Sequence, residues 1–274
     1  MNNIYLPHIA TIKKVEPQTP DTALISIVMD DLDIANQFNY LPGQFALLSV
    51  FGVGECPISF TSSPTYIGAP LQFCIRGIGK VTKAIVSLYE GEKIGIRGPF
   101  GNGFPIEQIE GKNLLFVAGG IGLIPLRSLI NYVLDNRNDY NEIEIIYGAK
   151  SPADLCFKEE LKNWNKDANV YLTVDKGDKN WKEYVGFVPQ ILENINPTHK
   201  DKVAFICGPP IMIKIVIDTL RKMEYPDNHI ITTLEMKMKC GVGKCGRCNI
   251  ENKYICIDGP VFTVEELKRL LWTG

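Results

Sequence analysis

The chain of 274 residues carries 29 Lys and Arg against 31 Asp and Glu, a formal net charge of −2 at pH 7. Because the basic residues are scattered and not clustered, neither a nucleic acid nor an anionic membrane surface is an expected partner. Its most apolar run, residues 114–124, is far shorter than the roughly 20 residues that span a bilayer, and the start MNNIYLPHIATIKK lacks the order of a secretory signal, so a soluble, cytoplasmic protein is expected.

The first part of the chain, from Ile9 to about Phe104, consists of short apolar runs separated by turn residues. The runs LISIVM, GQFALLSV, CPISFTSS, LQFCIRG and KIGIRGPFG have the length and spacing of strands in an antiparallel barrel or sandwich. One helical stretch, Val81 to Tyr89, begins directly after Gly79. The chain is longer than a usual single domain, and we place a first domain, an antiparallel barrel or sandwich, at residues 1–108.

From Asn113 to Glu235 the pattern changes to buried strands that alternate with helices. The strands are NLLFVAGG, EIEIIYGAK, NVYLTVD, KVAFICGPP and HIITTLE, and the helices include Pro125–Leu134 and Ile211–Lys222. Continuous apolar strands separated by helices indicate a parallel sheet covered on both faces. Residues 109–235 are therefore predicted to form a doubly wound α/β domain.

Two segments of this domain run from a buried strand through a glycine turn into a helix, LLFVAGGIGLIPL and FICGPPIMIK. Such turns let a pyrophosphate approach a helix N-terminus at the carboxyl edge of the sheet. Asp175, which closes VYLTVD, is expected at the same edge; a solvated loop position for Asp175 and a structural thiol for Cys207 are open alternatives. The nucleotide-binding residues predicted are Gly119, Gly120, Gly122, Pro125, Asp175, Cys207, Gly208, Pro209 and Met212.

Four cysteines cluster near the end of the chain, Cys240, Cys245, Cys248 and Cys256, whereas the other four are isolated in apolar segments. Disulfides suit short secreted chains better than this one. The spacing C-x4-C-x2-C-x7-C matches the plant-type ligand order of a [2Fe–2S] cluster, and the interleaved glycines let backbone N–H groups approach the sulfides. A structural zinc site is the alternative. Residues 236–274, which lack a core of their own, are predicted to form a lobe ordered by the metal.

A nicotinamide site and a one-electron cluster need a converter between hydride and single electrons, which a flavin supplies. Two stretches of the barrel fit a flavin: CPISFTSSP beside the ring, and RGIGKVTKAI with a helix N-terminus suited to a diphosphate. Ordinary strand and capping chemistry is the alternative for both. The residues predicted at the FAD are Pro57, Ile58, Ser59, Ile75, Arg76, Gly79, Lys80, Val81 and Thr82.

In chain order, the motifs CPIS, RGIGKVT, GPFGNGFP, AGGIGLIPL, YGAKSPADLCFKEEL, CGPPIMI, CGVGKCGRC and CIDGPVF resemble the ferredoxin–NADP reductase superfamily, in its branch with a C-terminal [2Fe–2S] lobe. That branch includes the electron-transfer subunit of dihydroorotate dehydrogenase, the gamma subunits of sulfhydrogenases and the B subunits of anaerobic sulfite reductases. The resemblance implies FAD in an N-terminal Greek-key barrel, NADH or NADPH in the α/β domain, and a cluster on the four clustered cysteines. The x7 interval, VGKCGRC and GPPIMI look most like the sulfite reductase subunit.

The flavin motif departs from the superfamily's usual Arg-x-Tyr-Ser/Thr, because this sequence has Cys56-Pro57-Ile58-Ser59 in its place. Both the phosphate-binding arginine and the stacking tyrosine are missing. By hypothesis, Arg76 supplies the missing positive charge.

The expected function is that of an oxidoreductase subunit that oxidises NAD(P)H through FAD and a [2Fe–2S] cluster. Its expected partners are a ferredoxin-like iron–sulfur subunit and a terminal reductase subunit of the sirohaem type, as in anaerobic sulfite reductase. No side chain is expected to act as acid, base or nucleophile. The alternatives are a gamma-type subunit of a hydrogenase or of a bifurcating NADH–ferredoxin oxidoreductase and, without redox chemistry, a zinc-stabilised nucleotide-binding regulator.

Overall fold

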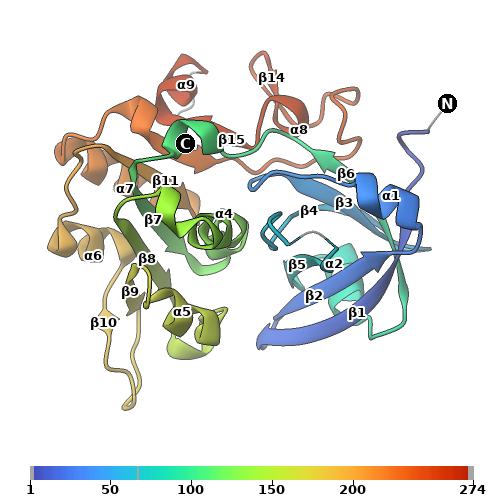
Figure 1. The fold of residues 1–274 in the computed structure, drawn as a ribbon, viewed down its shortest axis with the longest axis horizontal. Helices are drawn as coiled ribbons and strands as arrows, with labels where there is room; N and C mark the ends of the chain where they lie inside the picture. Colours follow the sequence, from blue (N-terminus) through green and yellow to red (C-terminus); the bar gives the residue numbers. More distant parts are fainter. Residues whose placement is uncertain (1–2, 67, 271–274) are drawn as a thin grey trace. The chain divides into compact units, whose positions relative to one another are not determined.

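A computed structural model of the chain describes residues 3–66 and 68–270, which fall into two compact units (Figure 1). The first unit comprises residues up to Phe104, Arg127–Tyr132 and Leu234–Pro260. The second comprises Pro105–Leu126, Val133–Thr233 and the residues from Val261 onward. Within the described ranges, no helix is long and apolar enough to cross a bilayer.

The first unit is built on an antiparallel, barrel-like sheet, as the sequence predicts. Its strand order is β4-β3-β6-β1-β2-β5. Alternating side chains enter the core: on β3, Ala46 and Leu48 belong to the core cluster of this unit, and the intervening Leu47 faces the other way. The strands are β1 (His8–Thr19), β2 (Thr22–Met29), β3 (Phe45–Val50), β4 (Gly54–Ser59), β5 (Leu71–Arg76) and β6 (Lys93–Phe100), and the helices are α1 (Leu32–Gln37) and α2 (Lys80–Val86).

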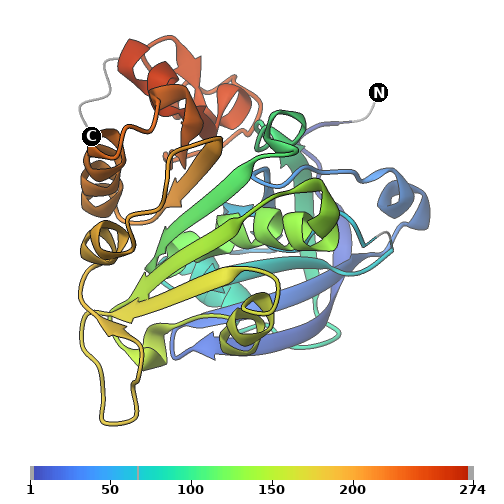
Figure 2. The same cartoon turned by 60° about the vertical axis from the view of Figure 1, so that its left-hand side comes forward.

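The second unit contains the predicted parallel sheet, in the order β10-β9-β8-β7-β11-β12-β15. Its central strands run side by side in Figure 2, and helices α6 and α7 cover one face, with Ile191 and Val216 packed on Leu115 and Ile206. Its strands are β7 (Asn113–Gly119), β8 (Ile143–Ala149), β9 (Asn169–Val174), β10 (Tyr184–Val185), β11 (Lys202–Cys207), β12 (Ile230–Thr233) and β15 (Val261–Thr263). Its helices are α3 (Ile106–Ile109), α5 (Lys158–Trp164), α6 (Val188–Ile195), α7 (Pro210–Lys222) and α9 (Val264–Arg269), and α4 (Leu123–Asp135) is divided between the two units.

The expected third segment, residues 236–274, is shared between the two units. Its cysteine-bearing part, with β13 (Asn249–Ile250), β14 (Lys253–Tyr254) and α8 (Ile255–Asp258), belongs to the first unit. Strand β15 instead joins β12 in antiparallel register, and Val264 enters the core of the second unit. The apolar side chains of VFTVEEL explain this, because they need a sheet to cover them. Residues 271–274 of this segment, and residues 1, 2 and 67 of the predicted barrel domain, lie outside the described residues.

Candidate functional site

The cysteine loop is closed by a small hairpin. Strands β13 and β14 pair through Asn249 and Tyr254, and the N–H of Ile255 donates to the carbonyl of Cys248 at 3.0 Å. This pairing brings Cys248 next to Cys256, so the seven-residue interval between them is the length of one tight hairpin. Cys240, Cys248 and Cys256 are buried, and Cys245 is exposed.

Backbone N–H groups of the loop point at the sulfurs. The N–H of Lys244 lies 3.3 Å from Cys240 Sγ, and that of Gly243 lies 3.2 Å from Cys256 Sγ. Burial opposes ionisation of Cys240, but the donors of Val242, Cys245 and Lys244 outweigh it and lower the pKa to about 6. Burial dominates at Cys256 and raises its pKa to about 12. Such N–H···S contacts stabilise the negative charge of a thiolate-bound cluster.

The four clustered cysteine side chains are arranged in two pairs. This arrangement can be compared with the one that a metal centre requires. The side chain of Cys240 interacts with that of Cys245, and the side chain of Cys256 with that of Cys248. Two pairs fit a [2Fe–2S] cluster, in which each iron takes two of the four thiolates.

The predicted flavin strand, β4, divides its residues between two faces. Ile58 packs against the core of the first unit, whereas Pro57 and Ser59 alternate with it and face outward. In the sheet, Pro57 lies opposite Leu47 on β3, and Leu47 lies opposite Arg97 on β6. Pro57, Leu47 and Arg97 therefore form a row across one face of the sheet.

The cysteine loop packs on that same face. A β-carbon at Gly241 would lie 3.0 Å from Leu47 Cδ1 and from the ring of Phe100. Beside this contact, Arg97 Nη1 approaches the carbonyl of Cys240 at 3.4 Å. One side chain, Leu47, thus separates the predicted flavin strand from the cysteine loop.

The other residues predicted at the FAD lie at β5 and at the start of α2. Ile75 is buried in the core, so only its backbone is available to a ligand. Thr82 Oγ1 accepts from the N–H groups of Ile78 and Gly79, at 3.1 and 2.8 Å, and holds the turn ahead of Lys80 and Val81. Arg76 is half exposed and its Nε donates to Asp21 at 2.6 Å. The hypothesis was that the positive charge of Arg76 binds FAD. In the structure this charge is paired with Asp21.

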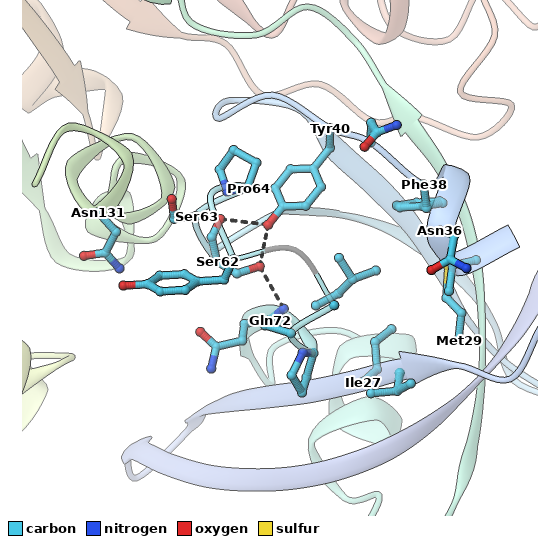
Figure 3. Close-up of a pocket in the computed structure, with 18 of the residues that line it drawn as sticks. Ile27, Met29, Asn36, Phe38, Tyr40, Ser62, Ser63, Pro64, Gln72 and Asn131 are labelled. Atoms are coloured by element: carbon cyan, nitrogen blue, oxygen red, sulfur yellow. Dashed lines mark hydrogen bonds between the residues drawn. The ribbon is translucent and has the colours of Figure 1, made fainter. Parts of the chain in front are cut away.

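A cavity of about 410 Å³ opens elsewhere in the first unit, between β2, α1 and the loop that precedes β5 (Figure 3). Tyr40 borders it and donates to the carbonyl of Ser62, at 3.1 Å. Arg127, also in its wall, donates to the carbonyl of Thr61 at 2.8 Å and to Gln72 Oε1 at 3.0 Å. Its lining contains none of the residues predicted at the FAD.

In the second unit, the two glycine turns meet at the ends of neighbouring strands. A β-carbon at Gly122 would lie 2.2 Å from the carbonyl oxygen of Cys207, and one at Gly119 would lie 2.4 Å from Met212 Sδ. Packing against the backbone of Cys207 requires glycine at position 122, whereas the contact at Gly119 is with the flexible end of the Met212 side chain. Gly120 differs, because it has a φ of +55° and open space beyond its Cα, where a ligand can approach the backbone.

The remaining residues predicted to bind the nucleotide lie in the second turn, at the start of α4 and after β9. Gly208 and Pro209 belong to the second turn, and Pro125 lies in the first turn of α4. Asp175 is exposed directly after β9, and β8 separates that strand from β7. The sheet thus brings the two turns together but puts Asp175 two strands away from the first.

Three buried basic residues in the described part of the chain were not identified from the sequence. Arg97 and Arg127 are nearly inaccessible in the first unit, and Lys202 is 1% exposed in the second, where it pairs with Glu142 and Glu144. The sequence carries a signal for two of them. Arg97 interrupts the apolar strand KIGIRGPF, and Lys202 begins the apolar strand KVAFIC. A buried charge in such a strand needs a partner.

Two family models match the chain. Residues 116–218 match the oxidoreductase NAD-binding domain, and residues 235–268 match the iron–sulfur cluster binding domain of dihydroorotate dehydrogenase B. The first range contains both glycine turns, and the second contains all four clustered cysteines. The chain therefore contains an oxidoreductase NAD-binding domain, and its cysteine loop belongs to an iron–sulfur domain.

Relatives match over nearly the whole length. The gamma subunit of sulfhydrogenase 2 from Pyrococcus furiosus is 40% identical, with 95% of this chain and 96% of the relative covered. A probable dihydroorotate dehydrogenase B electron-transfer subunit from Methanocaldococcus jannaschii is 33% identical, with 96% and 91% covered. Both are named as subunits of larger enzymes.

Solved structures share the fold. A structure of an NADH-dependent reduced ferredoxin–NADP oxidoreductase has a TM-score of 0.77 at 24% identity and covers 100% of this chain and 96% of that one. A ferredoxin–NADP⁺ reductase from Neisseria gonorrhoeae with bound FAD and NADP has a TM-score of 0.68 at 19% identity, with 82% and 96% covered. These likenesses show the shared fold, and the family models support a nicotinamide nucleotide and an iron–sulfur cluster as groups bound by this chain. The chain belongs to the family of NAD-binding, iron–sulfur electron-transfer subunits that includes the gamma subunits of sulfhydrogenases and the electron-transfer subunits of dihydroorotate dehydrogenase B.

Proposed function

We propose that this subunit collects electrons from NAD(P)H and delivers them singly, through FAD and a [2Fe–2S] cluster, to an iron–sulfur subunit of a larger complex. Bound FAD would supply the conversion between a two-electron hydride donor and a one-electron acceptor. In this proposal the glycine turns of the second unit hold the nucleotide, Pro57 and Ser59 border the flavin, and Cys240, Cys245, Cys248 and Cys256 hold the cluster.

The observation that carries the proposal is the position of Leu47. It lies beside Pro57 in the sheet and touches the backbone at Gly241. Neighbouring strands are about 4.8 Å apart, so the sequence β4-β3-β6 spans only about 10 Å. If β4 borders the flavin and the cysteine loop holds the cluster, as proposed, the two groups would be neighbours within one unit, and electron transfer between them needs this proximity.

The exit for electrons is proposed at Cys245. It is the exposed ligand of the four, and the exposed side chains of Lys244 and Arg247 flank it. A partner that docks here is expected to present acidic side chains around its own cluster, because opposite charges steer association.

Two acceptors remain as proposals. The identity of 40% with a sulfhydrogenase gamma subunit favours a hydrogenase-type complex. The short x7 interval before Cys256 and the motif GPPIMI favour a sirohaem-type sulfite reductase, but that assignment rests on sequence resemblance alone. The two differ only in where the electrons go after the partner's iron–sulfur subunit.

The first experiment is an anaerobic purification followed by a visible spectrum before and after addition of NADH or NADPH. Flavin bands above a broad iron–sulfur envelope, both bleached by a nucleotide, are the expected result and identify the donor. Cys248→Ser should remove the iron–sulfur envelope and leave the flavin bands reducible, whereas Cys156→Ser, outside the loop, should change neither. A colourless protein that contains zinc and binds no FAD would overturn the proposal in favour of a nucleotide-binding regulator.

The acceptor is tested on the complex isolated under anaerobic conditions from its natural source. Nickel in the co-purified subunits, with hydrogen-dependent reduction of the nucleotide, would assign the hydrogenase type. Sirohaem absorption, with NAD(P)H-dependent reduction of sulfite, would assign the sulfite reductase type.

A further inference from the structure

A buried arginine lies between the barrel and the cysteine loop. Arg97, on β6, is 5% exposed, and its guanidinium forms a two-pronged ion pair with Glu55: Nε donates to Oε2 at 2.9 Å and Nη2 to Oε1 at 2.7 Å. The side chain of Glu55 is 26% exposed, so the desolvation cost falls mainly on the buried guanidinium. Its retention at this position therefore calls for a role.

The third prong of the guanidinium is directed away from Glu55. Nη1 donates to the carbonyl of Ile4 at 2.9 Å and approaches the carbonyl of Cys240 at 3.4 Å. The rings of Tyr5 and Phe100 lie 5.9 and 5.6 Å from the guanidinium carbon. The positive charge is thus enclosed between the N-terminal segment and the residue that carries the first cluster ligand.

The contacts of Cys240 couple this charge to the metal centre. Its carbonyl faces Arg97, and its Sγ accepts from the N–H groups of Val242 at 3.5 Å and Lys244 at 3.3 Å. Arg97 and Cys240 are both buried, so the electrostatic interaction between them is screened less than one at the surface. A positive charge favours the reduced cluster, which carries one more electron, and a negative charge opposes it.

Resting on the proposed function, we propose that Arg97 and Glu55 are a positioning pair that sets the reduction potential of the cluster. Arg97 holds the backbone at Cys240 and raises the potential, and Glu55 holds Arg97 and offsets part of that effect. The reaction affected is the transfer of one electron from reduced flavin onto the cluster.

The test is an EPR-monitored redox titration of purified, iron-loaded protein, with iron content measured first. Glu55→Gln leaves the arginine charge uncompensated and should raise the midpoint potential. Arg97→Gln leaves the glutamate charge and should lower it. The double variant should return to within a small fraction of the wild-type value. A tenfold change in the electron-addition equilibrium, about 59 mV for one electron, is the expected size of each single shift.

Two further variants separate this role from a merely structural one. Lys14→Gln breaks the exposed pair with Glu16 in the same unit and should leave the potential unchanged. Arg97→Lys keeps the positive charge but loses the two-pronged hydrogen bonding of the guanidinium. Its reduction potential should therefore lie closer to that of the wild type than the potential of Arg97→Gln does, and its iron content should be lower than that of the wild type. Single variants that retain iron but shift the potential in the same direction, or not at all, overturn the proposal. If Arg97→Gln fails to fold, the sign of the shift in Glu55→Gln decides alone. A protein without iron would overturn the proposed function itself, and iron analysis identifies that case.

Discussion

The backbone of Gly241 packs against the ring of Phe100. A β-carbon at position 241 would come within 3.0 Å of two ring carbons and of Leu47 Cδ1, and the φ of Gly241 is +76°. Gly241 therefore combines two requirements, a left-handed backbone and a close approach to the barrel, that only glycine meets together.

Gly241→Ala is expected to lower iron content and to destabilise the first unit by about 2–4 kcal/mol, since steric overlap adds to backbone strain. Gly246→Ala is the matched control, because Gly246 also has a positive φ, +69°, but open space around its Cα. It should cost only about 1 kcal/mol. Iron analysis and urea unfolding of both variants check the difference, and equal losses would contradict the packing role.

In the second unit, Gly122→Ala is expected to weaken nucleotide binding at least tenfold. The added methyl would overlap the carbonyl oxygen of Cys207, at 2.2 Å, and force the two turns apart. The dissociation constant for NADH or NADPH should be measured by titration, with FAD content as the control for the first unit. Reduced FAD content in this variant would show that the damage spreads beyond the nucleotide edge.

Removal of the ammonium group of Lys202 is expected to be among the more damaging single changes in the second unit. Lys202 is 1% exposed and bonds to Glu142 and to the buried Glu144. Lys202→Met leaves Glu144 as an uncompensated buried carboxylate and should cost about 3–5 kcal/mol of unfolding free energy. Lys200→Met, at a neighbouring exposed position, should stay within about 0.5 kcal/mol of wild type. Urea unfolding of the two variants checks this.

Lowering the pH should weaken the packing of α9 against the segment that carries Asp227. Burial works against ionisation of Asp227, but its bonds to Arg221 and Lys268 hold its pKa below the ordinary 3.8. Because the folded pKa is the lower one, this stabilisation is present above about pH 4 and is lost as the pH falls through and below that value. Asp227→Asn should therefore cost about 1–2 kcal/mol at pH 7 and show a shallower loss of stability below pH 4. Asp218→Asn, which removes only an exposed contact 3.6 Å from Arg221, should follow the wild-type curve.

The fold was predictable because its signals are local. Period-two strands and buried strands that alternate with helices indicate the antiparallel and parallel sheets directly, and the structure contains both. The helix predicted at Val81–Tyr89 is observed at Lys80–Val86 and that at Pro125–Leu134 at Leu123–Asp135. The placement of β15 was not predictable in this way, because pairing with β12 is a contact between strands separated by the whole cysteine loop.

The candidate site was predictable where the spacing of residues encodes the chemistry. The four clustered cysteines are predicted as ligands from spacing alone, and a family model for an iron–sulfur domain spans them, but their individual role as ligands stays a prediction. The FAD and nucleotide contacts stay predictions. Arg97 was missed because its role depends on Glu55, Ile4 and Cys240, which only the folded chain brings together. Its one sequence signal was a charge within an apolar strand.

The pairing of β12 with β15 makes the cluster-bearing segment an insertion. Thr233 lies opposite Val261 in the sheet, and the N–H of Leu234 donates to the carbonyl of Pro260 at 2.8 Å. Both ends of Leu234–Pro260 are therefore held at one point. The entropic cost of closing a loop grows only slowly with the number of residues in the loop. A lobe of different length could be grafted between the same two strands without a shift in their register. The point at which the cluster-bearing segment leaves and rejoins the sheet is thus set by the pairing of β12 with β15 and not by the length of the segment.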